Sequence, residues 1–191
     1  ADGKRLVDGL QPLVPVAGRP LCHWVVACLQ QAGAREITLL HNSNGRAVRN
    51  SLEGAFSDIR WTFLQADTAS SWESFRLVSR TLSESAEDFL VSTVDALVPP
   101  PEAQRFIRLS IAHGADASLA LTSFIDDEKP LWAEVDGNGR VTKLGDVSSR
   151  RQLATSGLYY LTSRTASCMP EPQAFASLRG YLISLVESGS L

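Results

Sequence analysis

A single carboxylate ends an otherwise apolar stretch near the middle of the chain. The stretch LVSTVDALVPP, residues 90–100, passes through several apolar residues, reaches Asp95 and then meets a run of prolines. A carboxylate at the end of a strand can hold a hard divalent cation, and Mg²⁺ takes one or two carboxylates together with substrate phosphates. The same residue could instead cap the following helix or start a turn. This stretch alone leaves both interpretations open.

A second group of residues suited to phosphate lies at the start of the chain. The segment ADGKRL, residues 1–6, combines Gly3 with Lys4 and Arg5. Backbone N–H groups and cationic side chains of such a loop converge on anionic oxygens. Short turns of this composition are also common on protein surfaces, so the loop by itself does not separate phosphate binding from a solvated turn.

Composition excludes several classes of protein. The 191 residues, 44% hydrophobic and 20% charged, suffice for one ordinary domain with a full core. A net charge of −3 gives no basic field for nucleic acid. No apolar stretch is long enough to cross a bilayer, and no signal-peptide pattern opens the sequence. Cys22, Cys28 and Cys168 lack metal-binding spacing, and we interpret them as reduced, mostly buried thiols of a cytoplasmic protein.

Helical and strand patterns alternate over the first two thirds of the chain. The helical patterns cover residues 18–34, 45–56, 71–85 and 101–114, and the strand patterns cover 35–40, 59–65, 88–94 and 116–122. This alternation predicts an α/β fold with three α/β/α layers. Segments 35–40, 61–65, 89–94 and 116–122 should be mainly parallel neighbours in one Rossmann-like sheet, covered by helices on both faces.

The pattern changes after about residue 123. Two short strands within 130–146 flank DGNG, which is a strong hairpin signal. A further strand follows at 154–162, and a helix follows at 174–188. We therefore expect a single domain over residues 1–191 with a small antiparallel hairpin appendage.

Several motifs, in this order, resemble the sugar-phosphate nucleotidyltransferase family, the NDP-sugar pyrophosphorylases. After the glycine-containing loop, PLVPVAGRPL (12–21) matches the family signature almost letter for letter. QADTASSWESF (65–75), LVSTVDALV (90–98), GRVTKL (139–144) and TSGLYYLT (155–162) follow at the expected places. The resemblance covers nearly the whole chain and implies a nucleotide-diphospho-sugar transferase fold.

The resemblance also implies a chemistry. A sugar 1-phosphate oxygen attacks the α-phosphorus of a nucleoside triphosphate, and pyrophosphate leaves in line while Mg²⁺ and basic groups offset the developing charge. Such catalysis is mostly positioning and electrostatics. The implied partners are these two small molecules, with no nucleic acid and no membrane, and a homo-oligomer is left open.

The family motifs assign roles to individual residues of this chain. Gly3 would let the backbone approach the phosphates, Arg5 would clamp them, and Asp95 would hold the metal. Ser70 and Ser71 would reach the base or ribose. Gly157, with Ser156 beside it, would leave room for the sugar.

The sequence also departs from the family pattern. The lysine before PLVPV is replaced by Gln11, so its charge is either lost or supplied by Lys4. The E-K-P motif after the hairpin reads GDV (145–147), and DEKPL (127–131) is interpreted as a turn. By the same resemblance, the family's first strand would precede residue 1, and the strand with a second metal-binding aspartate would follow residue 191.

Two functions therefore stay open. The first is an active nucleotidyltransferase, acting on a sugar 1-phosphate or on another phosphorylated alcohol; a cofactor precursor is a weaker variant. The second is a catalytically impaired member that serves as a nucleotide-sugar sensor or regulatory subunit, for which Gln11 is the main argument.

The remaining histidines and aromatic residues are expected to be mostly structural. For His41 a ligand contact stays open beside a structural role, because its place at the end of the 35–40 strand puts it at the edge of a ligand pocket. His23 and His113 lie on predicted helices. The tryptophans at 24, 61, 72 and 132 are expected to pack, and Arg150 and Arg151 form either a solvated pair or a phosphate contact.

Overall fold

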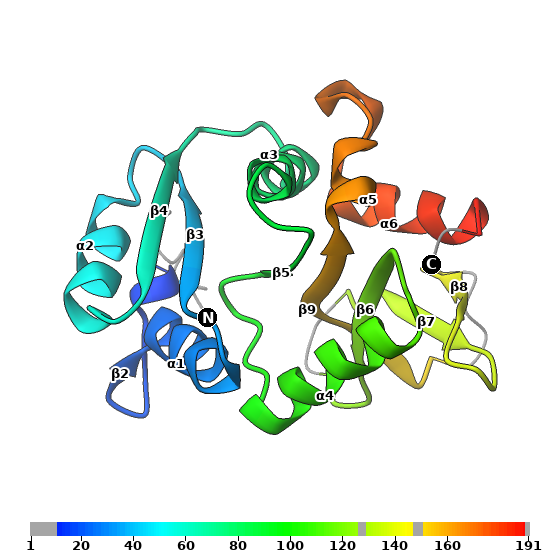
Figure 1. The fold of residues 1–191 in the computed structure, drawn as a ribbon, viewed down its shortest axis with the longest axis horizontal. Helices are drawn as coiled ribbons and strands as arrows, with labels where there is room; N and C mark the ends of the chain where they lie inside the picture. The colour runs from blue at the N-terminus through cyan, green and yellow to red at the C-terminus, as the bar shows by residue number, and fades with distance from the viewer. Residues whose placement is uncertain (1–10, 126–128, 147–150, 190–191) are drawn as a thin grey trace, which may run out of the picture. The chain divides into compact units, whose positions relative to one another are not determined.

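The structure, a computed structural model, describes residues 11–125, 129–146 and 151–189 as a mixed α/β fold (Figure 1). The chain divides into two compact units. The first unit comprises Ala1–Thr68 and Thr93–Arg105, and the second comprises Ala69–Ser92 and Phe106–Leu191. Each unit has its own hydrophobic core.

The first unit alternates short strands and helices. Its elements are a 3₁₀ turn η1 (Gln11–Leu13), β1 (Pro15–Val16), β2 (Arg19–Pro20), α1 (Leu21–Ala32), β3 (Glu36–His41), α2 (Arg46–Ala55) and β4 (Arg60–Gln65). β3 and β4 pair in parallel from Glu36↔Arg60 to His41↔Gln65. Buried residues of α1, α2 and the loop before β4 form the core, among them Val26, Leu52 and Ile59.

Local signals set the two ends of α1. Pro20 stands at its N-cap and Gly33 ends it with a φ of 122°. The start of the predicted helix, however, is wrong: residues before Leu21 form a two-residue hairpin between β1 and β2. Ala17 and Gly18 both have positive φ, of 49° and 78°, as a tight hairpin turn requires.

The second unit contains most of the strands. Its elements are α3 (Ser71–Ser83), β5 (Asp88–Ser92), β6 (Ala117–Thr122), β7 (Trp132–Val135), β8 (Val141–Leu144), β9 (Leu153–Thr162), α5 (Ser163–Ser167), a 3₁₀ turn η2 (Pro172–Ala174) and α6 (Leu178–Glu187); α4 (Pro100–Ala112) begins in the first unit and ends here. None of the helices in the described ranges is both long and apolar enough to span a membrane.

β9 is the strand around which the second sheet is built. β5 and β6 each pair antiparallel with it, and β7 pairs antiparallel with its first residues. The expectation of one mainly parallel sheet is therefore wrong in the described part of the chain: only β3 and β4 pair in parallel. The reason is that β5 and β6 each pair antiparallel with β9 and not in parallel with each other.

The predicted hairpin is confirmed and its turn is built as the sequence suggested. β7 and β8 pair antiparallel across the DGNG turn. Asp136 Oδ1 accepts hydrogen bonds from the N–H groups of Asn138 and Arg140 at 2.8 and 3.0 Å. Gly139 adopts a φ of 82°.

Aromatic rings dominate the core of the second unit. Trp72 of α3 is completely buried, and its ring centroid lies 4.2 Å from that of Tyr181 of α6. Phe75 meets Tyr159 of β9 edge-on at 5.3 Å. The core thus joins α3 and α6 to the sheet, and the packing role predicted for Trp72 is confirmed.

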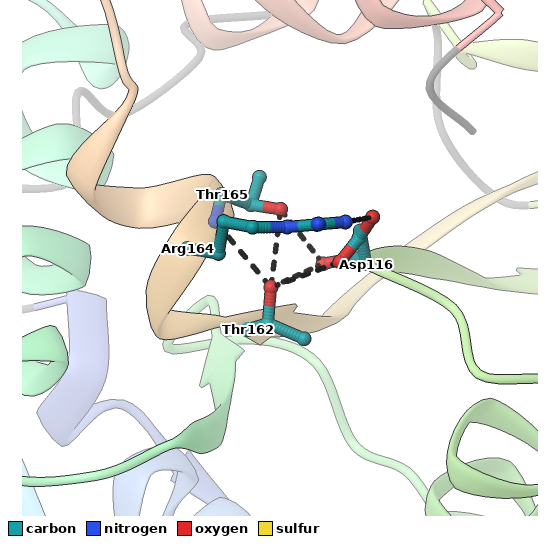
Figure 2. A network of polar contacts seen from close by, with 4 residues as sticks. All are labelled: Asp116, Thr162, Arg164 and Thr165. Atoms are coloured by element: carbon teal, nitrogen blue, oxygen red, sulfur yellow. Dashed lines mark hydrogen bonds and ion pairs between the residues drawn. The ribbon is translucent and has the colours of Figure 1, made fainter.

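A polar network fixes the end of β9 to the start of β6 (Figure 2). Thr162 caps α5 by accepting from the Thr165 N–H, and the Thr165 hydroxyl donates to the Asp116 carbonyl at 3.0 Å. Arg164 forms an ion pair with the Asp116 carboxylate. On the same strand the buried Tyr160 hydroxyl donates to Asp88 Oδ2 at 2.9 Å.

Two buried serines provide a matched test of hydrogen bonding in the second unit. Ser79 of α3 is fully buried, and its hydroxyl has no partner among the described residues. Ser110 of α4 is also buried but donates to the Phe106 carbonyl at 3.0 Å. Because an unpaired buried hydroxyl is costly, Ser79→Ala should raise the free energy of unfolding by about 1 kcal/mol. Ser110→Ala should lower it by about 1 kcal/mol, and urea denaturation of both variants checks the difference in sign.

The alkaline limit of stability should depend on Tyr160. Burial, the hydrogen bond to Asp88 and the negative charges of Asp88 and Asp116 raise the pKa of Tyr160 to about 12. An unfolded tyrosine titrates near pH 10, so the stabilising contribution is complete below about pH 10 and disappears as the pH rises towards 12. Tyr160→Phe should be less stable than wild type at pH 7, and this difference should shrink above about pH 10. Urea denaturation over that pH range measures it; a difference that stays constant would contradict the assignment.

Candidate functional site

The carboxyl ends of β3 and β4 lie side by side in the first unit, because these strands are parallel and in register. The Ala66 N–H donates to the His41 carbonyl at 3.0 Å, which extends the ladder past the last strand pair. The Ser43 N–H then donates to Asp67 Oδ1 at 2.8 Å and ties the two following loops together. Ligands of open α/β folds bind at such an edge, so we treat it as a candidate site.

Asp67 is a residue that the sequence reasoning did not single out. Its exposed carboxylate lies shortly after the end of β4, as Asp95 lies shortly after the end of β5. An acid placed after an apolar strand was the signal that identified Asp95, and the same signal would have found Asp67. In the structure Asp67 orders the loop after β3 through its bond to Ser43.

His41 occupies the edge position that the sequence predicted. It is the last residue of β3, it is half-buried, and it stands in register with Gln65. Its ring Nδ1 lies 2.8 Å from the Asn42 carbonyl oxygen. Contact with a ligand stays a prediction.

Asp95 lies exposed in a turn that follows β5. The turn is closed by the Ala96 N–H, which donates to the Thr93 carbonyl at 3.3 Å. The first-turn amides of Glu102 and Ala103 in α4 both donate to the Pro99 carbonyl. The alternative that Asp95 caps α4 therefore has no support in the described residues, whereas its place in a turn is confirmed.

Ser70 and Ser71 have structural partners. Ser70 is the N-cap of α3 and accepts from the Glu73 N–H at 3.1 Å, while Glu73 reaches back to the Ala69 N–H at 2.7 Å. This is a capping-box arrangement. The Ser71 hydroxyl accepts from the Leu178 N–H, which begins α6, at 3.1 Å. The nucleotide contacts predicted for both serines stay predictions, and the local bonds account for their presence at the start of a helix.

Ser156 and Gly157 form an irregularity in β9. β6 advances from Leu119 to Leu121 while its partners on β9 change from Tyr159 to Thr155, so the Ser156–Gly157 segment bulges opposite Ala120. Gly157 has a φ of 81°, a conformation that favours glycine, and Ser156 Oγ donates to the Ala120 carbonyl at 3.1 Å.

On the other edge of β9 the strand pairing is interrupted at the bulge. β5 pairs with β9 as far as Leu158, and β7 pairs with Leu153 and Ala154. Neither ladder includes Ser156 or Gly157. On this edge, and among the described residues, no strand pairs with the backbone of Ser156 and Gly157. These are the two residues predicted to bind the sugar, and an unpaired backbone fits a ligand contact.

The remaining predicted site residues lie at the start of the chain. Gly3, Lys4 and Arg5 lie outside the described residues. Gln11 is exposed at the start of η1, and its carbonyl accepts from the Val14 N–H at 3.1 Å. Its side-chain amide carries no charge, so the described part of the chain offers no cation at this signature position.

The carboxylates of the described residues fit a magnesium ion only if a bound substrate supplies further oxygen atoms. No group of three or more histidine, cysteine, aspartate or glutamate side chains gathers among the described residues in a way that could hold a metal. Mg²⁺ commonly takes one or two carboxylates and completes its shell with water and substrate phosphates. The exposed carboxylate of Asp95 suits that kind of site.

The other histidines and the cysteines have structural surroundings. His23 Nε2 lies 2.8 Å from Ser51 Oγ, and burial together with the Arg19 charge lowers the pKa of His23. Cys22 is buried, and its burial raises the pKa of the thiol. All three cysteines are free, as predicted, but Cys168 is exposed, so the expectation of burial is wrong for that residue.

Comparison with known proteins supports the resemblance found in the sequence. No protein-family model matches the chain. It is 28% identical over 144 residues to the bifunctional protein GlmU of Aromatoleum aromaticum, an alignment that covers 74% of this chain. The chain spans only 30% of the length of that relative.

Solved structures match over almost the whole chain. The inositol-1-phosphate CTP transferase from T. maritima superposes with a TM-score of 0.75 at 17% identity, covering 94% of this chain and 74% of that one. A UDP-glucose pyrophosphorylase complexed with UDP-glucose gives a TM-score of 0.69 at 14% identity, covering 93% and 79%. The resemblance is therefore confirmed: the chain has the nucleotide-diphospho-sugar transferase fold of the sugar-phosphate nucleotidyltransferases.

Proposed function

We propose that the chain is the nucleotidyl-transferring part of an enzyme that joins a nucleotide to a sugar 1-phosphate. The observation that carries the proposal is the structural likeness over 94% of the chain to an inositol-1-phosphate CTP transferase. That protein and the UDP-glucose pyrophosphorylase are both named for nucleotides and phosphorylated alcohols or sugars. The two units would then serve one nucleotidyltransferase-like domain over residues 1–191.

The reaction would be an in-line displacement at phosphorus. An oxygen of the sugar 1-phosphate forms a bond to the α-phosphorus of the nucleoside triphosphate, the bond from that phosphorus to the bridging oxygen breaks, and pyrophosphate leaves with the electron pair. No covalent intermediate with the protein is needed, so the protein contributes orientation and charge stabilisation.

The phosphates would be bound at the start of the chain and beside Asp95. Gly3 would allow close approach of the backbone, and Lys4 and Arg5 would supply positive charge to the triphosphate. Asp95 would hold Mg²⁺ through its exposed carboxylate. When bound, the ion would neutralise phosphate charge and orient the leaving group.

The organic parts of the substrates would be bound elsewhere in the fold. Ser70 and Ser71 would contact the base or ribose. Both hydroxyls already accept backbone hydrogen bonds, so each would contact the ligand through its remaining lone pair or its proton. Ser156 and Gly157 would contact the sugar through the backbone groups that the bulge leaves outside the β5 and β7 ladders.

A second function is favoured by one residue. Gln11 replaces a lysine of the family signature, and glutamine cannot stabilise charge that develops on phosphate as an ammonium group does. A chain that binds nucleotide sugars without turnover would act as a sensor or regulatory subunit.

The role of Asp95 can be tested by removing its carboxylate. Asp95→Ala should weaken Mg²⁺-dependent binding of a nucleoside triphosphate about tenfold or more, which corresponds to about 1.4 kcal/mol, and should leave the free energy of unfolding nearly unchanged. Asp58→Ala is a matched control, because Asp58 is also exposed in a turn of the first unit but precedes β4. Calorimetry with and without Mg²⁺ measures the affinities. Equal binding by both variants would remove Asp95 from the site.

The role of Gln11 separates the enzyme from the sensor. If the missing lysine slows an active enzyme, Gln11→Lys should raise the rate of pyrophosphate release, by analogy with single electrostatic donors worth on the order of 10²–10³ in rate. If Lys4 already supplies the charge, Gln11→Lys should change little and Lys4→Ala should abolish most activity. Gln31→Lys adds the same charge at an exposed position of α1 and serves as the control. Pyrophosphate release by wild type would exclude the sensor, whereas nucleotide-sugar binding without release by any variant would exclude the enzyme.

A further inference from the structure

His41 ends β3, and its ring is anchored through Nδ1. We propose that this ring contacts the nucleotide directly and accepts a hydrogen bond from it through Nε2. The inference rests on the proposed function, because it assigns a further contact with the same nucleotide, at the candidate edge where β3 and β4 end. It goes beyond that function by assigning a specificity-determining contact to a residue outside the motifs that carry the family resemblance.

The hydrogen bond at Nδ1 sets the tautomer of the ring. Nδ1 lies 2.8 Å from the Asn42 carbonyl oxygen, and a carbonyl oxygen can only accept. Nδ1 must therefore carry the proton, which leaves a lone pair on Nε2 of the neutral ring. No described residue forms a hydrogen bond with Nε2. The ring thus offers an unused acceptor at the opposite side from its anchored nitrogen.

Close packing against Gly45 holds the ring in this orientation. A Cβ atom added at Gly45 would lie 2.6 Å from His41 Cβ and 3.1 Å from Nδ1. The start of α2 therefore covers the Nδ1 side of the ring, with glycine as the residue that permits the approach. A half turn of the ring about the Cβ–Cγ bond would put the Cδ2 carbon in place of Nδ1 and so break the hydrogen bond to Asn42.

The position of His41 indicates a contact with a ligand. It stands in register with Gln65 at the carboxyl ends of the parallel strands, next to the Ser43–Asp67 bond. Such edges bind ligands in open α/β folds. A neutral Nε2 is an acceptor, so it suits a ribose hydroxyl or an exocyclic amino group of the base, and it does not suit a phosphate oxygen.

Two isosteric substitutions separate ligand contact from a purely local role. The side-chain amide of asparagine reaches the position of Nδ1, whereas that of glutamine reaches the position of Nε2. His41→Asn keeps a donor for the Asn42 carbonyl and loses the distal acceptor. His41→Gln keeps a distal acceptor and loses the local donor.

The affinities for CTP, UTP, ATP and GTP with Mg²⁺, measured by calorimetry, give the first readout. For the nucleotide that wild type binds, His41→Asn should weaken binding about tenfold or more, and His41→Gln should restore most of it. The reverse order, or unchanged binding by both variants, would overturn the proposal. Wild type that binds none of the four would overturn the proposed function together with this inference.

The chain's three histidines give a second readout that does not depend on the variants. His113 is the control, because its Nδ1 makes the same kind of bond, to the Leu109 carbonyl at 2.8 Å, at the end of α4. In the ¹⁵N spectrum of the imidazole rings, the nucleotide should shift the Nε2 signal of His41 and leave that of His113 in place. Should both variants lose binding, a shifted wild-type His41 signal supports the proposal. A nucleotide that binds while the Nε2 signal of His41 stays unchanged overturns it.

Discussion

The ladder of hydrogen bonds along β9 is the interaction on which the second unit depends. One edge of this strand pairs with β6, and the other pairs first with β7 and then with β5. Tyr159 and Leu161 project from it into the core that α3 and α6 complete. The polar network at its end and the bulge near its start both act on this one strand. Elements distant in the sequence are therefore brought together by a single ten-residue segment.

The first unit depends on smaller contacts. Its strands form only two-stranded pairs among the described residues, β1 with β2 and β3 with β4, and helices α1 and α2 supply most of the buried core residues. Arginines add to the aromatic packing: Arg19 lies 5.2 Å from the Trp24 ring centroid and Arg49 lies 4.4 Å from that of Phe63. The candidate nucleotide edge is formed where β3 and β4 end. Its loops are held by single hydrogen bonds such as that from Ser43 to Asp67.

The sequence predicted the types of element better than their partners. Helical periodicity, Pro20 and Gly33 defined α1, and DGNG defined the β7–β8 turn, because these signals act within a few residues. Strand pairing depends on contacts between distant segments, and no local signal showed that β9 would separate β5 from β6. The roles of Ser70 and Glu73 were readable as a capping box, since the spacing S-x-x-E is itself local. The partner of Ser71 was not readable, because Leu178 lies in a different helix.

The bulge in β9 has a consequence for which sequence changes this strand can accept. Between the two ladder pairs that flank the bulge, the chain advances by two residues in β6 and by four in β9. The extra length in β9 is therefore an even number of residues. Side chains alternate between faces along a strand, and an even insertion keeps that alternation in phase. Leu119 and Leu121 of β6 pack against the same core, so their ladder partners on β9, Tyr159 and Thr155, also share a face. An insertion or deletion of one residue here would turn the preceding half of the strand over, whereas a change of two would preserve its inward face. The segment that forms the candidate sugar contact should thus accept a change of two residues more readily than a change of one.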